Sequence, residues 1–257
     1  MRSLPHNGNG RLKNQSRYRV RGCATHSTLT AAVRAVTAFS DGLPLPSAFS
    51  QEKTMKLYTS TTSPYSRAIM LAALARGMDG LQLAFADPWA TPPELTAANP
   101  LSQVPVLLTD GGETICGTAY VADFLLDHPL QSAHQAAVAG YAQALLDQVV
   151  KAFSLAKFLP EGMAEHPHIP RARAAVVRGL EHAPQLDAHT DDFAMHLLGM
   201  AFSYAELRHP ALFGHLDAAN RAAFAAYQQR PDVRAVGISE LEKHPADLAA
   251  VRAAIRA

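Results

Sequence analysis

The spacing of hydrophobic residues changes partway along the chain. From Met55 to about residue 130, short apolar runs alternate with Pro, Gly and Ser/Thr clusters, which is typical of strands interleaved with helices. From about Gln131 onward only helical spacing remains, as in Val138, Tyr141 and Leu145. The pattern therefore predicts an α/β segment followed by an all-helical segment.

Four strands and up to three helices are expected in the first segment. The predicted strands cover residues 56–59, 81–86, 104–108 and 113–116, and Asp110-Gly-Gly112 between the last two signals a hairpin. A helix begins at Ser63-Pro64, with Ser at the N-cap and Pro at the first helical position, and ends at Gly77. Shorter helices are expected at 93–98 and 118–126.

The second segment shows helical spacing around residues 138–149, 174–183, 194–204 and 217–229. The predicted organisation is an α/β domain at 55–130, a linker at about 128–134, an all-helical domain at 134–240 and a C-terminal helix or tail at 241–257.

Residues 1–54 differ from the rest in charge. They hold six Arg and two Lys against Asp41 and Glu52, and they show no sustained period. A transit peptide, a disordered arm and an upstream extension that is not part of the working protein all fit this composition. We favour the third interpretation, because Met55 opens the first strand.

Composition excludes several classes of protein. Hydrophobic residues make up 48% and charged residues 18%, which supports a sizeable core. The net charge of +1 gives no case for nucleic acid or an anionic membrane as partner, and no apolar run reaches the length of a membrane span. Two cysteines, Cys23 and Cys116, are too few for a disulfide framework. They fit a reducing compartment, and we expect a cytoplasmic location.

Two stretches of sequence resemble the glutathione S-transferases. They are MKLYTSTTSPYSR at 55–67 and DPWATPPELTAANPLSQVPVL at 87–107, and Arg230-Pro231-Asp-Val adds a weaker match near the end of the helical segment. Bacterial zeta- and beta-like members of the Ser type look most similar. The resemblance covers about residues 55–237. It implies an α/β thioredoxin-like N-terminal domain followed by an all-α C-terminal domain.

Ser63 has two interpretations. As an N-cap, its hydroxyl accepts a hydrogen bond from a backbone N–H and contributes about 1 kcal/mol to stability. The same geometry suits catalysis, because a helix N-terminus favours a thiolate and the hydroxyl can donate to it. In the family the glutathione sulfur lies here, which makes Ser63 the expected catalytic residue. Thr61, Thr62 and Ser66 remain alternative hydroxyls.

The resemblance also supplies glutathione-binding residues. It implies a cis bond at Val104-Pro105, whose backbone would pair with the cysteinyl part of glutathione, and Gln103 would bind one end of the tripeptide. At Gly117-Thr118 the family usually has an acid followed by Ser. Thr118 keeps the hydroxyl for the γ-glutamyl carboxylate, whereas Gly117 lacks the acid that would bind the ammonium.

Other candidate residues have structural interpretations. We expect Cys116 to be a buried small hydrophobe. His166 and His168 lack a third ligand nearby, so no metal site is expected. Trp89 is either a wall of the electrophile pocket or a packed loop residue. Asp192 resembles the family's helix-capping Asp, with His189 in place of the usual Ser/Thr.

These residues predict a glutathione S-transferase that adds the glutathione thiolate to a small hydrophobic electrophile bound between the domains, against the helix at about 141–153. Glutathione is the cosubstrate, and a homodimer is expected. The alternatives are a glutathione-dependent isomerase or dehalogenase, or a non-catalytic interaction protein on the same fold. A glutathione-dependent disulfide reductase is disfavoured, because Ser63 stands where it would need Cys.

Overall fold

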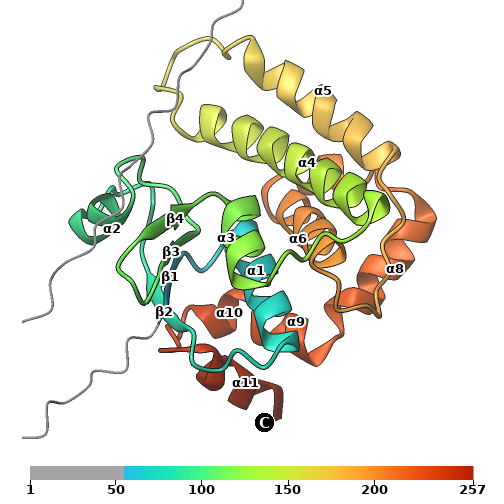
Figure 1. Cartoon of the computed structure of the whole chain (residues 1–257). Coiled ribbons are helices and arrows are strands. Elements are labelled where there is room, and N and C mark those ends of the chain that lie inside the picture. The colour runs from blue at the N-terminus through green and yellow to red at the C-terminus, as the bar shows by residue number, and fades with distance from the viewer. Residues whose placement is uncertain (1–54, 257) are drawn as a thin grey trace, which may run out of the picture. The chain divides into compact units, whose positions relative to one another are not determined.

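The computed structural model describes residues 55–256, a small mixed sheet with helices on both faces and a larger helical region (Figure 1). Residues 1–54, for which we favour a non-native extension, lie outside the described residues. In chain order the first elements are β1 (Lys56–Thr59), α1 (Pro64–Ala75), β2 (Gln82–Phe85), α2 (Pro93–Ala98), β3 (Val106–Leu108), β4 (Thr114–Cys116) and α3 (Thr118–Leu125).

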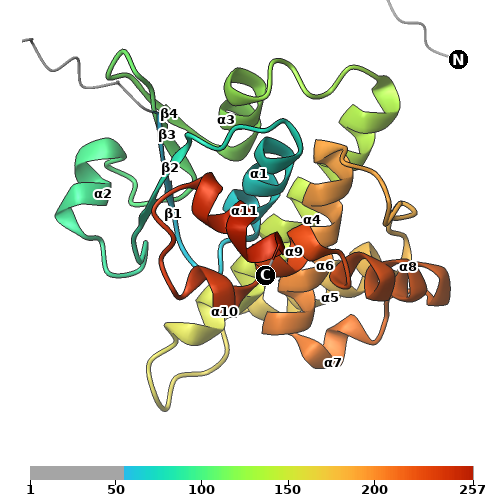
Figure 2. The same ribbon diagram turned by 90° about the horizontal axis from the view of Figure 1, so that it is seen from below.

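The four strands lie in the order β2-β1-β3-β4. Strand β1 is parallel to β2 and antiparallel to β3, and β4 is antiparallel to β3. Helices α1 and α3 lie on one face of the sheet and α2 on the other (Figure 1 and Figure 2). This arrangement confirms the predicted thioredoxin-like α/β fold.

The helical region begins with the longest helix, one residue before the expected segment. Its helices are α4 (Ala133–Lys157), α5 (His168–Glu181), α6 (Phe193–Arg208), α7 (Pro210–Phe213) and α8 (Ala218–Gln228). Helix α4 packs against α5 and α6, and α6 also packs against α1. Helix α6 therefore joins the two parts of the molecule, which explains why apolar residues occur all around it.

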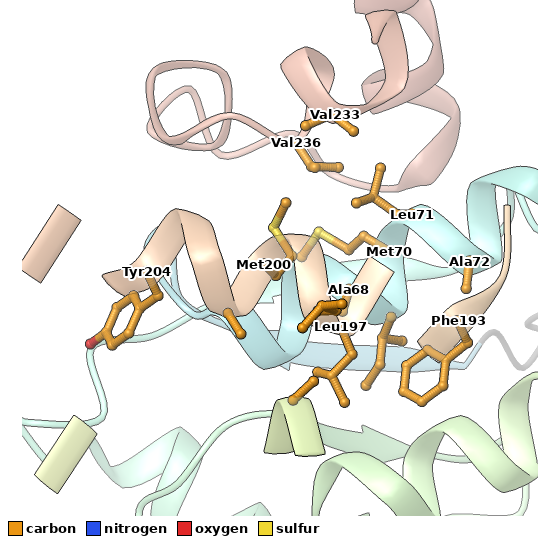
Figure 3. Close-up of a cluster of buried hydrophobic side chains, with 14 of the residues drawn as sticks. Ala68, Met70, Leu71, Ala72, Phe193, Leu197, Met200, Tyr204, Val233 and Val236 are labelled. Atoms are coloured by element: carbon orange, nitrogen blue, oxygen red, sulfur yellow. The ribbon is translucent and has the colours of Figure 1, made fainter. Parts of the chain in front are cut away.

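The contact between α1 and α6 forms the centre of the core. Figure 3 shows Ala68 and Met70 of α1 beside Leu197 and Met200 of α6, and each of these side chains is at most 2% exposed. Gly199 of α6 allows a further close approach, because a Cβ there would lie 2.5 Å from the ring of Tyr227. Burial of apolar surface, at roughly 25 cal/mol per Å², holds the two parts together.

The C-terminal segment packs against the sheet. It holds α9 (Pro231–Ala235), α10 (Ile238–Leu241) and α11 (Leu248–Arg256). The N–H of Leu83 in β2 donates to the carbonyl of Ala246 at 2.8 Å, and Leu248 N–H donates to Leu81 at 3.1 Å. Residues 246–248 of this segment thus cover the open edge of β2.

The exposure of Cys116 differs from the prediction. Cys116 was expected to be buried, but it is exposed, because it ends the edge strand β4, where alternate side chains point to solvent. Among residues 55–256, no helix combines the length and the apolar character that crossing a membrane requires.

Candidate active site

A cavity of about 970 Å³ lies between the α/β domain and the helical region. Its walls come from the loop before α1, the β2–α2 and α2–β3 loops, the start of α3, and helix α4. The structure brings together at this cavity all the site residues expected from the sequence, namely Ser63, Gln103, Val104, Pro105, Gly117 and Thr118. They belong to three separate loops, so the fold, and not chain proximity, assembles them.

Ser63 is the N-cap of α1 and is 7% exposed. Its Oγ accepts hydrogen bonds from the backbone N–H of Ser66 at 3.2 Å and from the Ser66 hydroxyl at 3.1 Å. A hydroxyl has two acceptor lone pairs and one donor. Because Ser66 occupies both lone pairs, the proton of Ser63 is left for a group in the cavity.

The alternative hydroxyls at this end of α1 are placed less favourably. Ser66 is fully buried and donates to Ser63. Thr62 lines the cavity, but its Oγ1 lies 3.4 Å from Nη2 of Arg208, from which it accepts. Thr61 does not line the cavity. Ser63 is therefore the hydroxyl best placed to meet a ligand here.

The Val104–Pro105 peptide bond is cis, as the resemblance implies. Among residues 55–256 the backbone N–H and C=O of Val104 have no hydrogen-bond partner. Asn99 shapes the preceding loop, since its Nδ2 donates to the Gln103 carbonyl at 3.0 Å and its Oδ1 accepts from Leu101 N–H at 3.1 Å. The Val104 backbone is thus available for strand-like pairing with an extended ligand.

Gly117 and Thr118 form the uncapped N-terminus of α3. No side chain caps this end, so its first N–H groups can bind an anion. Gly117 has φ +88°, a conformation that L side chains rarely adopt. A backbone requirement therefore accounts for glycine at this position. A Cβ there would meet the Tyr120 ring at 3.4 Å, so space is not the obstacle.

The wall opposite Ser63 is mixed in character. Helix α4 contributes Val150, Lys151 and Leu155, and α6 contributes Tyr204. Trp89 also lines the cavity and is 42% exposed, with its ring 5.2 Å from that of Phe158. Trp89 is thus a wall residue, and it also packs against the ring of Phe158, which follows α4.

Tyr65 and Asp147 connect the two parts of the molecule across this cavity. The Tyr65 hydroxyl donates to Oδ1 of Asp147 at 2.7 Å. Burial, together with this hydrogen bond, raises the pKa of Tyr65 above its ordinary value. Its proton is already donated, so Tyr65 is not placed to stabilise a thiolate. Asp147 is the one acidic residue of the described chain that lines the cavity.

One cluster of the described residues resembles a metal site. Ligand atoms of Asp191, His196 and Asp232 lie within 4.8 Å of one another. Arg230, however, donates to both carboxylates, at 2.7 Å for Asp232. The cluster is therefore an ion-pair network. His166 and His168 line the cavity with stacked rings, and no third ligand joins them within residues 55–256.

Sequence reasoning missed Asn99, which shapes the loop before Val104 through local hydrogen bonds. It also missed Asp147 and Arg208, which act through contacts between distant segments; Cζ of Arg208 lies 4.1 Å from the Phe153 ring centroid. The helical period places Asp147 and Phe153 on α4 but does not indicate which face of α4 meets the α/β domain.

Comparisons with known proteins agree with this geometry. Residues 62–128 match the family model of the glutathione S-transferase N-terminal domain. A search among curated proteins found no significant match.

Solved structures show the same fold. A glutathione transferase family member from Pseudomonas fluorescens Pf-5, crystallised with bound glutathione, is 24% identical with a TM-score of 0.60, covering 72% of this chain and 98% of that one. A glutathione S-transferase from Methylobacillus flagellatus KT with glutathione bound gives 23% and 0.57, covering 72% and 99%. Gtt2 from Saccharomyces cerevisiae gives 21% and 0.54, covering 70% and 99%.

The sheet, the helical region and the cavity between them define a two-part thioredoxin-like protein with the glutathione S-transferase fold. Within this fold, residues 62–128 match the glutathione S-transferase N-terminal domain, and the solved structures share the fold of the whole described part of the chain.

Proposed function

We propose that this chain is a glutathione transferase in which Ser63 holds the glutathione thiolate for addition to a small electrophile. The observation that carries the proposal is the hydrogen bonding of Ser63 at the N-terminus of α1. Both lone pairs of its Oγ accept from Ser66, which leaves its proton free to donate to a ligand in the cavity that Ser63 lines. The neighbours crystallised with glutathione support this ligand.

Glutathione would bind along three groups of the α/β domain. The free backbone groups of Val104 pair with its cysteinyl residue, and the N-terminus of α3 with Thr118 binds the γ-glutamyl carboxylate. Gln103 binds an end of the tripeptide. Gly117 supplies no charge for the ammonium, so binding depends on the backbone contacts.

The chemical step follows from the position of the sulfur. The thiol loses its proton to water, and the helix N-terminus and the Ser63 hydroxyl stabilise the thiolate. A shift of ~2 units in the thiol pKa requires about 2.7 kcal/mol, which one hydrogen bond and a helix terminus can supply. With an aryl halide, the sulfur forms a bond to carbon and the halide leaves with the bonding electrons.

The electrophile would lie against α4. Val150, Leu155, Tyr204 and Trp89 give this part of the cavity an apolar character. An isomerase or a dehalogenase would use the same thiolate and differ only in what this wall accepts.

A non-catalytic interaction protein is the second candidate. The observation that favours it is the lack of an acid at Gly117, together with the engagement of Asp147 by Tyr65 and Gln143. Retention on immobilised glutathione, followed by turnover of an activated aryl halide, separates the two. Retention with turnover supports the transferase. Failure of both supports the interaction protein.

The proposal includes a homodimer in the cytoplasm. Tyr120 and Phe124, one turn apart on α3, are 73% and 56% exposed. Such a pair of large side chains on one helix face is typical of an interaction surface. We expect light scattering to give twice the chain mass for the wild type and the chain mass for Phe124→Glu. A monomeric wild type would contradict this.

A further inference from the structure

A second cavity contains a buried cation without a matching acid. Arg67 follows Ser63 by one turn of α1 and is only 5% exposed. Its Nε donates to the Val236 carbonyl at 2.8 Å, and its Nη1 lies 3.4 Å from Oγ of Ser203. Among residues 55–256, Nη2 has no hydrogen-bond partner, and Arg67 has no ion pair.

A buried charge without a partner is unfavourable. Desolvation lowers the pKa of Arg67 to about 10, so the group is still a cation at neutral pH. The two hydrogen bonds, to a carbonyl and a hydroxyl, satisfy donors but leave the charge uncompensated. An anion that reached the guanidinium would remove this deficit.

The space for such an anion is present. Arg67 lines a cavity of about 650 Å³, within the range of small-molecule sites. The wall comes from α1, α6, α8, α9, α10 and α11, and it shares no residue with the cavity at Ser63. Figure 2 shows the side of the molecule where α9, α10 and α11 lie. In Figure 3, Val233 and Val236, which flank this cavity, lie over Leu71 of α1.

The charges around this second cavity favour an anion. Arg234 also lines it, is exposed, and forms no ion pair with the described residues. The one acidic lining residue, Glu240, is paired with Lys243 at 2.7 Å. Two cations thus face the space without acidic partners.

The remaining lining defines the rest of the ligand. Ser203 and Ser239 offer hydroxyls, the first of them 3.4 Å from Nη1 of Arg67, while Met200, Phe224 and Ile255 give an apolar side. A carboxylate can accept from the free Nη2 of Arg67, and a short carbon body matches the apolar side.

We propose that this second cavity binds a small organic carboxylate, with its carboxylate on Arg67 and Arg234 and its carbon body against Met200, Phe224 and Ile255. The site is independent of the glutathione cavity, so it does not rest on the transferase proposal.

The test uses the full chain and two matched probes, 3-phenylpropionate and its neutral amide, in isothermal titration calorimetry. We expect the carboxylate to bind at least tenfold more tightly than the amide. We also expect its Kd to be unchanged when S-hexylglutathione is present. Equal binding of the two probes, or displacement by S-hexylglutathione, would overturn the proposal.

Variants locate the site. Arg67→Met is expected to weaken binding of 3-phenylpropionate at least tenfold. Arg234→Gln should weaken it several-fold and Glu240→Gln should strengthen it, whereas Arg221→Gln, on α8 but outside the cavity wall, should leave it unchanged. If Arg67→Met does not fold, the test rests on Arg234→Gln and Glu240→Gln, for which we expect opposite changes in the Kd of 3-phenylpropionate. An unchanged Kd in both of these variants would refute the assignment.

Discussion

Ser63 and Arg67 lie one helical turn apart but line two different cavities. Ser63 caps the start of α1 at one cavity, and Arg67, one turn later, lines another. The Ser-Pro pair is a local capping signal, which made Ser63 predictable. Arg67 carries no such signal, since its significance comes from contacts with Val236 and Ser203 far along the chain.

A substitution at Thr118 tests the part of the proposed site that binds the γ-glutamyl carboxylate. Thr118→Ala removes one charge-assisted hydrogen bond, so we expect glutathione affinity to fall by about 1.5–3 kcal/mol at most. The measurement is calorimetric titration with glutathione, with an unchanged melting temperature as the control. Unaltered affinity would place the γ-glutamyl carboxylate elsewhere.

Gly117 needs a matched pair of variants because its φ is positive. Gly117→Ala and Gly117→Glu should both destabilise the protein, by about 1–3 kcal/mol, through the same backbone strain. Only Gly117→Glu supplies an acid for the ammonium, so it should bind glutathione more tightly than Gly117→Ala.

At the scale of elements, capped or strongly periodic segments were predictable. The four strands, α1 with its Ser-Pro start and α6 with its apolar run follow from local pattern. The short helices α7 and α10 could not be predicted, because a segment of four residues is too short to show a helical period. The exposure of Cys116 was missed because an apolar run does not show whether its strand lies at the edge of a sheet.

The attachment of α11 to the α/β domain is tested by Arg252. Its Nε donates to Asp79 at 2.6 Å and its Nη2 donates to the Leu74 carbonyl at the end of α1. We expect Arg252→Ala to lower the free energy of unfolding by about 1 kcal/mol, since the ion pair is partly exposed. Thermal or urea unfolding measures the change.

Lys243→Ala is the control for Arg252→Ala. Its ion pair with Glu240 joins residues three apart on the surface, so removing it should change stability by less than about 0.5 kcal/mol. If the two variants melt alike, α11 contributes little through Arg252.

At the scale of the whole molecule, His196 sets part of the acid stability. It is fully buried, its Nδ1 lies 3.1 Å from the Tyr227 hydroxyl, and its Nε2 has no partner among the described residues. Burial, reinforced by Arg230, lowers its pKa to about 4, although Asp191, Asp192 and Asp232 oppose this. The folded state therefore resists protonation of His196.

The sign of the effect follows from proton linkage. Between pH 6.5 and about 4 the unfolded chain binds the His196 proton and the folded chain does not, so stability falls as pH falls through this window. The contribution is about 3 kcal/mol. His196→Gln should flatten the pH dependence of urea unfolding in that window. An unchanged slope would exclude His196 as the cause.

The central claim is that Ser63 lowers the pKa of bound glutathione. The most direct measurement is the thiolate absorbance of the glutathione complex as a function of pH, for wild type, Ser63→Ala and Ser66→Ala. We predict a depressed thiol pKa in the wild type, a smaller depression in Ser66→Ala, and a value near that of free glutathione in Ser63→Ala, with aryl-halide conjugation falling in the same order. A bound thiol that titrates identically in wild type and Ser63→Ala would contradict the account and reduce Ser63 to a helix cap.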